Sequence, residues 1–543
     1  MEALRLVPPD THWHQVAYAT KETPEEAIHV MLEEMREKFN ELAVQEFPEA
    51  DAAASVGERP EWDAVRGIGD DPSGTFAEHL GTRQLLYGRP HPLVVVSMDS
   101  NRTIFYDAAI LVCNGNVDML GSFKEVTEAI SGDRHVPVPI NLGAQGPRVV
   151  LPGLINTHVH TAQQLGRGIA DDVDLITWLH RRIWPYESNM SPADHFWSAL
   201  LCGVELIKSG VTAFAEAGGP HPTAQALAVQ YLGLRCCLSR STMDAGEGLP
   251  DNWKESTDEC MEKQIDLFNR CHNMAEGRVK VWFGLRQIMN CSDELIVRTR
   301  TEAEKRKTGC HMHVAELNFE NEFVQSKRTA SSDKDGTVAH LHQIGCLYPG
   351  LLAAHSVWLE DREVQLLGEA NVGVAHCPAA AMKMLGFCPV EGLLGAGCPV
   401  GLGTDGAPSN NRMNLFDEMY LASLINKGKH AHVNRETKPE ALPAETILEM
   451  ATVHGARAIL QNESLGSLEP GKCADLIVLD MDSVSTSPCH NLIATLVSSC
   501  RSENVESVMC NGQWLMWERE LGVDEALIHQ QAGTHAQELL RRA

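Results

Sequence analysis

The sequence predicts an α/β protein in which a (β/α)8 barrel of the TIM type is inserted in a small β-sandwich domain, preceded by an N-terminal helical extension. Three observations support this fold class. Strand-like and helical runs alternate through the middle of the chain, as a parallel α/β fold requires. β-rich runs lie on both sides of that middle part. The 543 residues leave room for a barrel of roughly 200 to 400 residues with accessory elements.

The barrel is expected over residues 151–463, with its first strand beginning just before. Eight apolar runs are predicted as its strands: Val149–His160, Val211–Ala217, Leu234–Arg240, Val279–Leu285, Gly309–Ala315, Leu351–Ser356, Val372–Cys377 and Val400–Asp405. In a closed barrel of this kind, the residues at the carboxyl ends of the strands surround the active site. We therefore expect the chemistry at these strand ends.

The β-sandwich is expected to combine residues 91–150 with residues 464–520. The first part contains V-V-V-S-M from Val94 and T-I-F-Y-D-A-A-I-L-V from Thr103. The second contains A-D-L-I-V-L-D from Ala474 and S-V-M-C-N-G-Q-W-L-M-W from Ser507. Because one group of strands precedes the barrel and the other follows it, the two groups are expected to form a single β domain, into which the barrel is inserted. Residues 521–543 are expected to form a C-terminal helix.

Residues 1–90 are expected to form an extension. Thr23, Pro24 and Glu26 form a helix start with a capping box, and apolar residues then recur at helical spacing as far as residue 47. This pattern predicts a docking helix over residues 23–47. Residues 48–90 are dominated by Gly, Pro, Asp and Ala, which predicts a linker.

Composition excludes several classes of partner. The chain has 45 basic and 73 acidic residues, a formal charge of −28, which opposes binding to nucleic acid or to an anionic membrane surface. Its apolar runs fall short of the roughly 18 residues of a membrane span. The 16 cysteines form no C-x-x-C pair, and the N-terminus lacks the features of a signal or transit peptide. A reduced, cytoplasmic setting is expected.

The strongest candidate site lies at the predicted strand ends. His158 and His160 lie two residues apart at the end of the first strand, where both side chains would point to one face. His313, His355 and Asp405 lie at the ends of the fifth, sixth and eighth strands. Each histidine alone is more often a core residue, and a lone H-x-H is a weak signal. Together they predict a centre for one divalent metal, Zn²⁺ or Fe²⁺, with a position left for water.

Four motifs carry a resemblance to a known family. L-P-G-L-I-N-T-H-V-H from Leu151, H-V-A-E from His313, A-A-H-S-V from Ala353 and G-T-D-G-A-P-S-N-N from Gly403 resemble the amidohydrolase superfamily. More narrowly, they are similar to the branch of methylthioadenosine/S-adenosylhomocysteine deaminases and atrazine and triazine hydrolases. E-P-G-K-C-A-D-L-I-V-L-D from Glu469 is typical of the strand that returns to the small β domain.

The resemblance implies a role for each residue. It makes His158, His160, His313 and Asp405 the metal ligands, and Asp405 also the acceptor of a proton from water. It makes Glu316 the carboxyl that moves a proton to a substrate ring nitrogen, and His355 the imidazole that orients the attacking water. In related two-metal barrels a lysine ends the fourth strand, but here Lys280 begins it and Arg286 ends it. One metal is therefore expected, with Zn²⁺ preferred.

The residues expected at the substrate leave the substrate open. Trp178 and Glu187 resemble the adenosine-type deaminases, in which the Trp lines the pocket and the Glu contacts ribose. Gln163 and Arg286 resemble guanine deaminase, in which they bind the purine, and Gln163 also has a counterpart in atrazine chlorohydrolase. Leu285-Arg286 replaces the Pro-His usual in adenosine-type enzymes, and H-C-P-A-A-A from His376 replaces H-N-P-A-S-N.

The sequence therefore predicts hydrolytic removal of an amino group from an aminated N-heterocycle. The substrate would be a small molecule: a purine base or nucleoside, such as guanine, methylthioadenosine or S-adenosylhomocysteine, or an s-triazine. The alternative within enzymes is hydrolysis of chloride or alkylamine from a triazine-like ring. A non-catalytic interaction protein is a weaker alternative, because such barrels normally lack the metal ligands. The resemblance also implies a homo-oligomer.

Overall fold

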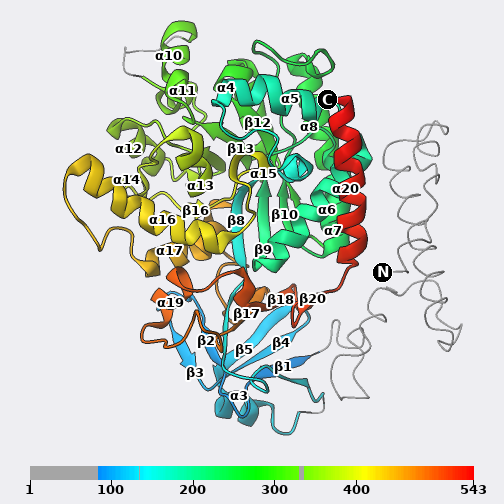
Figure 1. Ribbon diagram of the computed structural model, residues 1–543, viewed down its shortest axis with the longest axis vertical. Coiled ribbons are helices and arrows are strands. Elements are labelled where there is room, and N and C mark those ends of the chain that lie inside the picture. The colour runs from blue at the N-terminus through cyan, green and yellow to red at the C-terminus, as the bar shows by residue number, and fades with distance from the viewer. Residues whose placement is uncertain (1–82, 134, 329–334) are drawn as a thin grey trace, which may run out of the picture.

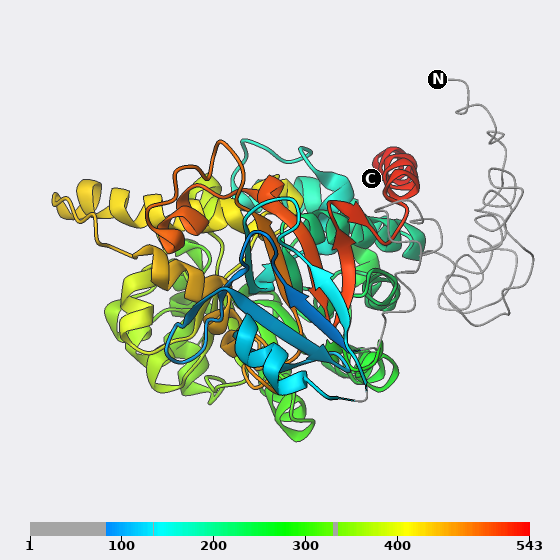
Figure 2. The same ribbon diagram turned by 90° about the horizontal axis from the view of Figure 1, so that it is seen from below.

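The structure, a computed structural model, describes residues 83–133, 135–328 and 335–543. The helix predicted over residues 23–47 lies outside these residues. Figure 1 shows a β region, built from an early and a late segment of the described chain, beneath a larger region of strands and helices. In Figure 2, seen from below, the same β region lies in front. The fold is mixed α/β. Within the described residues, no helix has the length and apolar character needed to cross a membrane.

The β region contains two sheets. One sheet has the strand order β5-β4-β1-β6. Its strands are β1 Gln84–Tyr87, β4 Ala108–Cys113, β5 Asn116–Ser122 and β6 Val138–Asn141. The other has the order β20-β19-β18-β17-β7-β2-β3. Its strands are β2 Val94–Val96, β3 Ile104–Tyr106, β7 Arg148–Pro152, β17 Leu476–Asp480, β18 Val505–Cys510, β19 Gln513–Trp517 and β20 Glu520–Leu521.

Strands from distant parts of the chain share the second sheet. β7 pairs with β17 in antiparallel orientation and with β2 in parallel orientation. Side chains of both sheets form one buried cluster, which includes Leu86, Ile110, Val150, Val478 and Trp514. The two β-rich segments therefore build one unit, because each supplies strands whose apolar faces need the other for burial.

The boundary predicted at residue 90 is too late. β1, at Gln84–Tyr87, lies inside the predicted extension, yet it pairs with β4 and β6. Leu86 is completely buried in the cluster between the sheets. The strand is only four residues long, and Gly81, Gly88 and Pro90 beside it suggested a loop.

The larger region contains two parallel sheets. One has the order β11-β10-β9-β8 and the other β12-β13-β14-β15-β16. Their strands are β8 Leu154–Val159, β9 Val211–Glu216, β10 Arg235–Leu238, β11 Val279–Val281, β12 Phe283–Gln287, β13 Cys310–Val314, β14 Leu351–His355, β15 Gly373–His376 and β16 Val400–Leu402. Backbone hydrogen bonds also connect the two sheets. Arg286 N of β12 donates to Thr242 O, in the segment after β10 (3.1 Å), and Thr404 N, after β16, donates to His158 O of β8 (3.1 Å).

Two predicted strands are divided in the structure. The run predicted over Val149–His160 forms β7 and β8, which lie in different sheets and meet at Gly153. A Cβ at Gly153 would lie 2.1 Å from Thr212 Oγ1, so the close approach requires glycine. The run predicted over Val279–Leu285 forms β11 and β12, which belong to different sheets and are separated by Trp282.

Helices follow most of these strands and cover the outside of the sheets. They include α6 Pro192–Lys208, α7 Pro222–Leu232, α8 Thr257–Cys271, α9 Asp293–Lys305, α10 Asn318–Lys327, α11 Thr337–Gln343, α12 Asp361–Glu369, α14 Val390–Gly395, α16 Leu415–Lys429 and α17 Ala444–Ala451. Ser191 and Ser256 start α6 and α8 with capping boxes. The C-terminal helix α20, Glu525–Arg542, packs on α6, where His535 Nδ1 lies 2.8 Å from Asp194 Oδ1.

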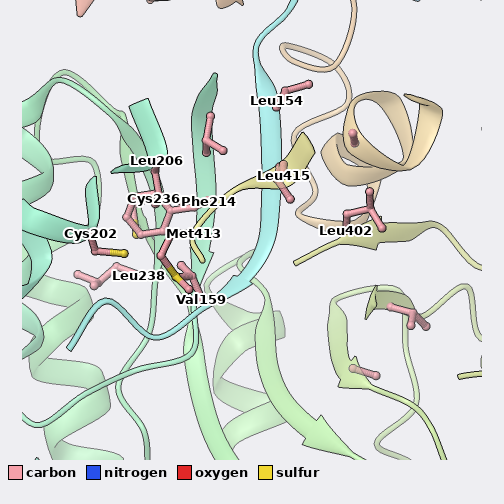
Figure 3. Close-up of a cluster of buried hydrophobic side chains, with 14 of the residues drawn as sticks. Leu154, Val159, Cys202, Leu206, Phe214, Cys236, Leu238, Leu402, Met413 and Leu415 are labelled. Carbon is pink, nitrogen blue, oxygen red and sulfur yellow. The ribbon is translucent and has the colours of Figure 1, made fainter. Parts of the chain in front are cut away.

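The main core lies between strands and helices. Figure 3 shows part of it, where Phe214 and Leu238 of the strands approach Leu206 and Cys202 of α6. All sixteen cysteines lie in the described part of the chain, and all are free thiols. Most of them are buried and act as small apolar residues in the core.

Candidate active site

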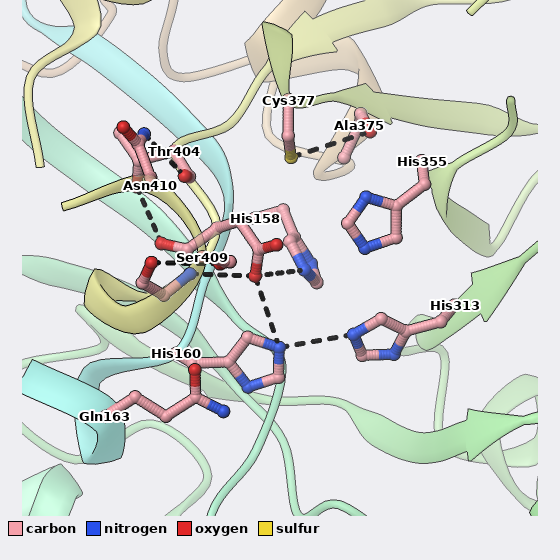
Figure 4. A network of polar contacts seen from close by, with 12 residues as sticks. His158, His160, Gln163, His313, His355, Ala375, Cys377, Thr404, Ser409 and Asn410 are labelled. Carbon is pink, nitrogen blue, oxygen red and sulfur yellow. Dashed lines mark hydrogen bonds and ion pairs between the residues drawn. The ribbon is translucent and has the colours of Figure 1, made fainter. Parts of the chain in front are cut away.

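The H-x-H pair and the aspartate lie together at the strand ends. His158 lies in β8 and His160 directly after it, and Nε2 of each lies 3.5 and 3.6 Å from Asp405 Oδ1. Asp405 follows β16, and its backbone N–H donates to His158 O (2.9 Å). Figure 4 shows both rings turned toward the same carboxylate oxygen. Hydrogen bonding between β8 and the segment after β16 thus brings the first predicted motif, which contains His158, next to the last, which contains Asp405.

His313 and His355 complete a cluster of four imidazoles. His313 Nε2 lies 3.2 Å from His160 Nε2, and the rings of His158 and His355 are 4.9 Å apart. Two groups could hold a metal ion, His158 with His313 and His355, and His158 with His160 and Asp405. In each group the ligand atoms lie within 4.8 Å of one another, and every member is buried.

The protonation pattern of this cluster fits a divalent metal. His313 Nδ1 donates to Arg286 O (2.8 Å), which leaves its Nε2 lone pair facing the cluster. Burial holds the pKa of His160 and of His313 well below the ordinary value, so both imidazoles are neutral. His158 Nε2 is buried without a hydrogen-bond partner. Neutral imidazole nitrogens beside a carboxylate are the donors that zinc and similar ions prefer.

His311 belongs to this arrangement and was missed by the sequence analysis. Its Nδ1 lies 3.1 Å from the backbone carbonyl of Glu216, and its Nε2 lies 2.9 Å from His158 Nδ1. A carbonyl only accepts, so His311 Nδ1 donates to it and His311 Nε2 accepts from His158 Nδ1. These two hydrogen bonds, from Glu216 O through His311 to His158 Nδ1, direct the lone pair of His158 Nε2 toward the cluster. The signal was present as a second H-x-H, in C-H-M-H-V from Cys310.

Glu316 and His355 form the candidate acid–base pair. Glu316 Oε1 lies 3.6 Å from His355 Nε2, and both side chains are buried. Burial, together with the negative charges of Asp405 and Glu320, raises the pKa of Glu316 well above the ordinary value. Burial lowers the pKa of His355 to about 3. Burial thus favours the protonated form of the Glu316 carboxyl and the neutral form of the His355 imidazole.

The predicted substrate residues are all buried. Gln163 lies in a short 3-10 helix, η4 Thr161–Gly166, Trp178 ends α4 Leu175–Trp178, Glu187 lies in α5 Trp184–Ser188 and Arg286 lies in β12. Gln163 Nε2 donates to Glu187 Oε1 (2.9 Å). The residues that separately suggested purine and ribose recognition are thus hydrogen-bonded to each other.

The positive charge of Arg286 influences both Glu187, near the predicted substrate residues, and Glu316 of the acid–base pair. Burial raises the pKa of Glu187, and the positive charge of Arg286 opposes that rise. The same arginine opposes the rise in the pKa of Glu316. Arg286 therefore acts electrostatically on both carboxyls.

Several polar atoms here are buried without a partner. They are Gln163 Oε1, Trp178 Nε1 and Arg286 Nε. Unsatisfied buried donors and acceptors are costly, so water or a bound molecule is needed to supply their partners. A cavity of about 250 Å³ opens beside Glu187, and Gly219, His221, Arg240 and Met243 also line it.

Comparison with known proteins gives consistent results. The model of the amidohydrolase family matches residues 149–515. The chain is 35% identical to the 5′-deoxyadenosine deaminase of Methanosarcina acetivorans over 453 residues, 83% of this chain and 97% of that protein. It is 34% identical to the 5-methylthioadenosine/S-adenosylhomocysteine deaminase of Pelotomaculum thermopropionicum over 450 residues, 82% and 98% of the two chains. A crystal structure of an adenosine deaminase from Xanthomonas campestris with bound zinc superposes with a TM-score of 0.75 at 26% identity, covering 84% of this chain and 98% of that one.

Proposed function

This chain belongs to the amidohydrolase family and is a hydrolytic deaminase, and we propose that its substrate is a purine nucleoside of the 5′-deoxyadenosine type. Water would replace the amino group of the adenine ring, and ammonia would leave. The observation that carries this proposal is the buried Glu316 carboxyl, 3.6 Å from His355 Nε2, beside the cluster of four histidines and Asp405. The names and coverage of the two relatives support the nucleoside.

The proposed metal site consists of His158, His160, His313 and Asp405. We propose a single Zn²⁺, because the donors are nitrogen and carboxylate oxygen and the similar adenosine deaminase structure contains zinc. When bound, the metal would polarise a water molecule so that it attacks at neutral pH.

The chain's own residues would handle the protons. His355 would orient the attacking water, and Asp405 would accept one of its protons. Glu316 would give its proton to the ring nitrogen next to the attacked carbon, which removes the negative charge that develops there. Asp405 would then pass its proton to the leaving amine. Glu316 would recover a proton from the new hydroxyl as the carbonyl forms.

Glu187 is the proposed contact to ribose. Its carboxylate is buried, faces the charge of Arg286 and is held by Gln163 at 2.9 Å. A carboxylate fixed in this way can accept hydrogen bonds from two neighbouring hydroxyl groups. Gln163, Trp178 and Arg286 would also contact the substrate, since each has a buried polar atom without a protein partner.

Three broader features are proposals of the same kind. We propose that the two parallel sheets close into one (β/α)8 barrel, supported by the hydrogen bonds that Thr242 O accepts from Arg286 N and His158 O accepts from Thr404 N. We propose a cytoplasmic setting, supported by the sixteen free thiols. We also propose a homo-oligomer, on the basis of the family resemblance alone.

The first experiment is ammonia release by the zinc-loaded protein from a panel of heterocycles. The panel contains 5′-deoxyadenosine, methylthioadenosine, S-adenosylhomocysteine, adenosine, guanine, 8-oxoguanine, melamine and ammeline. Release from adenosine derivatives is expected. Release from guanine or a triazine alone would refute the nucleoside assignment. No release from any of them, with metal bound, would favour a different leaving group.

Glu316→Gln is expected to retain metal and lose turnover. The amide has the size of the carboxyl but cannot exchange a proton with the ring, so kcat should fall by about 10³-fold or more. Metal analysis and single-turnover ammonia release test this. Glu322→Gln, an exposed position six residues on, serves as a control. Full activity of the Glu316→Gln protein would disprove the acid–base role.

A further inference from the structure

Glu320 is a buried carboxylate that the proposed chemistry does not use. It lies in the first turn of α10, four residues after Glu316, and its side chain is completely buried. Its Oε1 accepts the backbone N–H groups of Glu316 (2.7 Å) and Leu317 (3.1 Å). Its Oε2 accepts the N–H of Ala315 (3.0 Å) and the hydroxyl of Thr337 (2.8 Å).

These contacts extend beyond the capping of a helix. In a capping box the residue at this position bonds the N–H of the N-cap, here Leu317. The bonds to Ala315 and Glu316 reach two residues further, into the turn that joins β13 to α10. That turn is bent, because Ala315 has a φ of 50°. The carboxylate therefore holds three consecutive N–H groups around the backbone of Glu316.

The same turn is held on its other side by the segment after His355. Val357 N and Trp358 N both donate to Ala315 O, at 3.0 and 2.9 Å. Ser356 N donates to Val314 O at 3.0 Å. The backbones that carry Glu316 and His355 are thus bonded directly to each other. Glu320 binds the N–H groups of the same turn, at Ala315, Glu316 and Leu317.

We infer that Glu320 is a positioning residue, which fixes the Glu316 carboxyl against His355 and the substrate ring by binding the backbone of residues 315–317. This inference rests on the acid–base role proposed for Glu316. Proton transfer needs heavy atoms within about 3.2 Å, and a displacement of about 1 Å can cost about 100-fold in rate. Glu320 would therefore affect turnover although it does not touch the substrate.

Glu320→Gln tests the inference, because it keeps the size of the side chain and replaces one acceptor oxygen by an NH2 group. We expect kcat to fall about 10- to 100-fold. We also expect KM to stay within about twofold and metal content to be unchanged, since neither the ligands nor the ribose contact is altered. Glu322→Gln makes the same chemical change at an exposed position of the same helix and should leave kcat unchanged. An unchanged kcat in the Glu320→Gln protein would overturn the inference, as would loss of metal.

A double variant separates positioning from general stability. If Glu320 acts through Glu316, then Glu320→Gln should cost nothing further in a Glu316→Gln background, measured in single-turnover reactions. An equal loss in both backgrounds would identify a merely structural role. If Glu316→Gln alone keeps full activity, the proposed function is at fault, whatever Glu320 does.

A milder change covers the case in which Glu320→Gln does not fold. Thr337→Val removes the hydroxyl that Glu320 Oε2 accepts and leaves the carboxylate in place. We expect a folded protein with a kcat about 3- to 10-fold lower and an unchanged KM, because one of four bonds is lost. A folded Thr337→Val protein with normal kcat, beside a Glu320→Gln protein that cannot fold, would overturn the inference.

Discussion

The two H-x-H pairs, His158/His160 and His311/His313, have the same spacing but different geometry. The rings of the first pair lie 5.1 Å apart at an interplanar angle of 88°, and both face Asp405. The rings of the second pair lie 6.5 Å apart at 9°. Only His313 faces the cluster, while His311 lies behind His158.

The difference comes from where each strand ends. His311 and His313 both lie within β13, so the regular rise of a strand keeps their rings parallel and one layer apart. β8 ends at Val159, and His160 has φ −111° and ψ 89° as the chain turns into η4. This turn brings the second ring to the same carboxylate as the first. An H-x-H pair thus places two rings on one centre when the strand stops between them.

The largest predicted effect breaks the first pair. His158→Ala is expected to lose metal and activity together, with turnover reduced by about 10³-fold or more, because a ligand shared by both candidate groups disappears. Metal content after dialysis and ammonia release measure the two losses. Retention of a full equivalent of metal would mean that His158 is not a ligand.

A smaller effect is expected behind the cluster. His311→Ala removes the acceptor of His158 Nδ1, so metal affinity should fall about 10- to 100-fold while bound metal remains detectable. Competition with a chelator measures the affinity. His340→Ala removes an equally buried histidine that bonds Asp293 on another helix and is the matched control.

Either of two results would contradict the different roles assigned to His158 and His311. If His311→Ala abolished binding as completely as His158→Ala, both pairs would act as ligands. If it had the same affinity as His340→Ala, His311 would have no part in orienting His158.

The smallest effect concerns Glu216, which connects the two pairs. Its carboxylate accepts the N–H of Thr161 (3.1 Å), directly after His160, and its backbone carbonyl binds His311. Burial raises its pKa from 4.5 to about 7. Between these pH values the folded protein therefore keeps a proton on Glu216 that the unfolded chain has lost. The contribution of Glu216 to the free energy of unfolding is complete below pH 4.5 and is lost as pH rises through about 7.

Glu216→Gln should remove this pH dependence. In metal-free protein, the free energy of unfolding of the wild type should fall by about 3 kcal/mol more than that of the variant between pH 4.5 and 8. Urea unfolding at both pH values measures it, and Glu322→Gln should behave as the wild type. Parallel curves for wild type and Glu216→Gln would refute the raised pKa.

Elements with a strong local sequence pattern were predictable, and elements with a weak pattern were not. The strands predicted at Val211–Ala217 and Leu351–Ser356 match β9 and β14 to within a residue, because they are continuous apolar runs. β1 was missed, since four residues between glycines and a proline carry too little pattern. Glu316 and Glu320 lie in one charged run, E-L-N-F-E-N-E, that alone suggests a solvated surface. Both are buried, as is the whole of β13, the strand before them.

By itself, the sequence determined the residue types available for chemistry and their order along the chain. Short motifs identified six candidate residues at or just after the ends of strands: His158, His160, His313, His355, Glu316 and Asp405. Tertiary structure alone decided how distant side chains combine. It placed His311 behind His158, joined Gln163 to Glu187 and turned Glu320 onto the backbone of Glu316. Such contacts depend on where strands stop and turns bend, and those are set by packing between segments far apart in the chain.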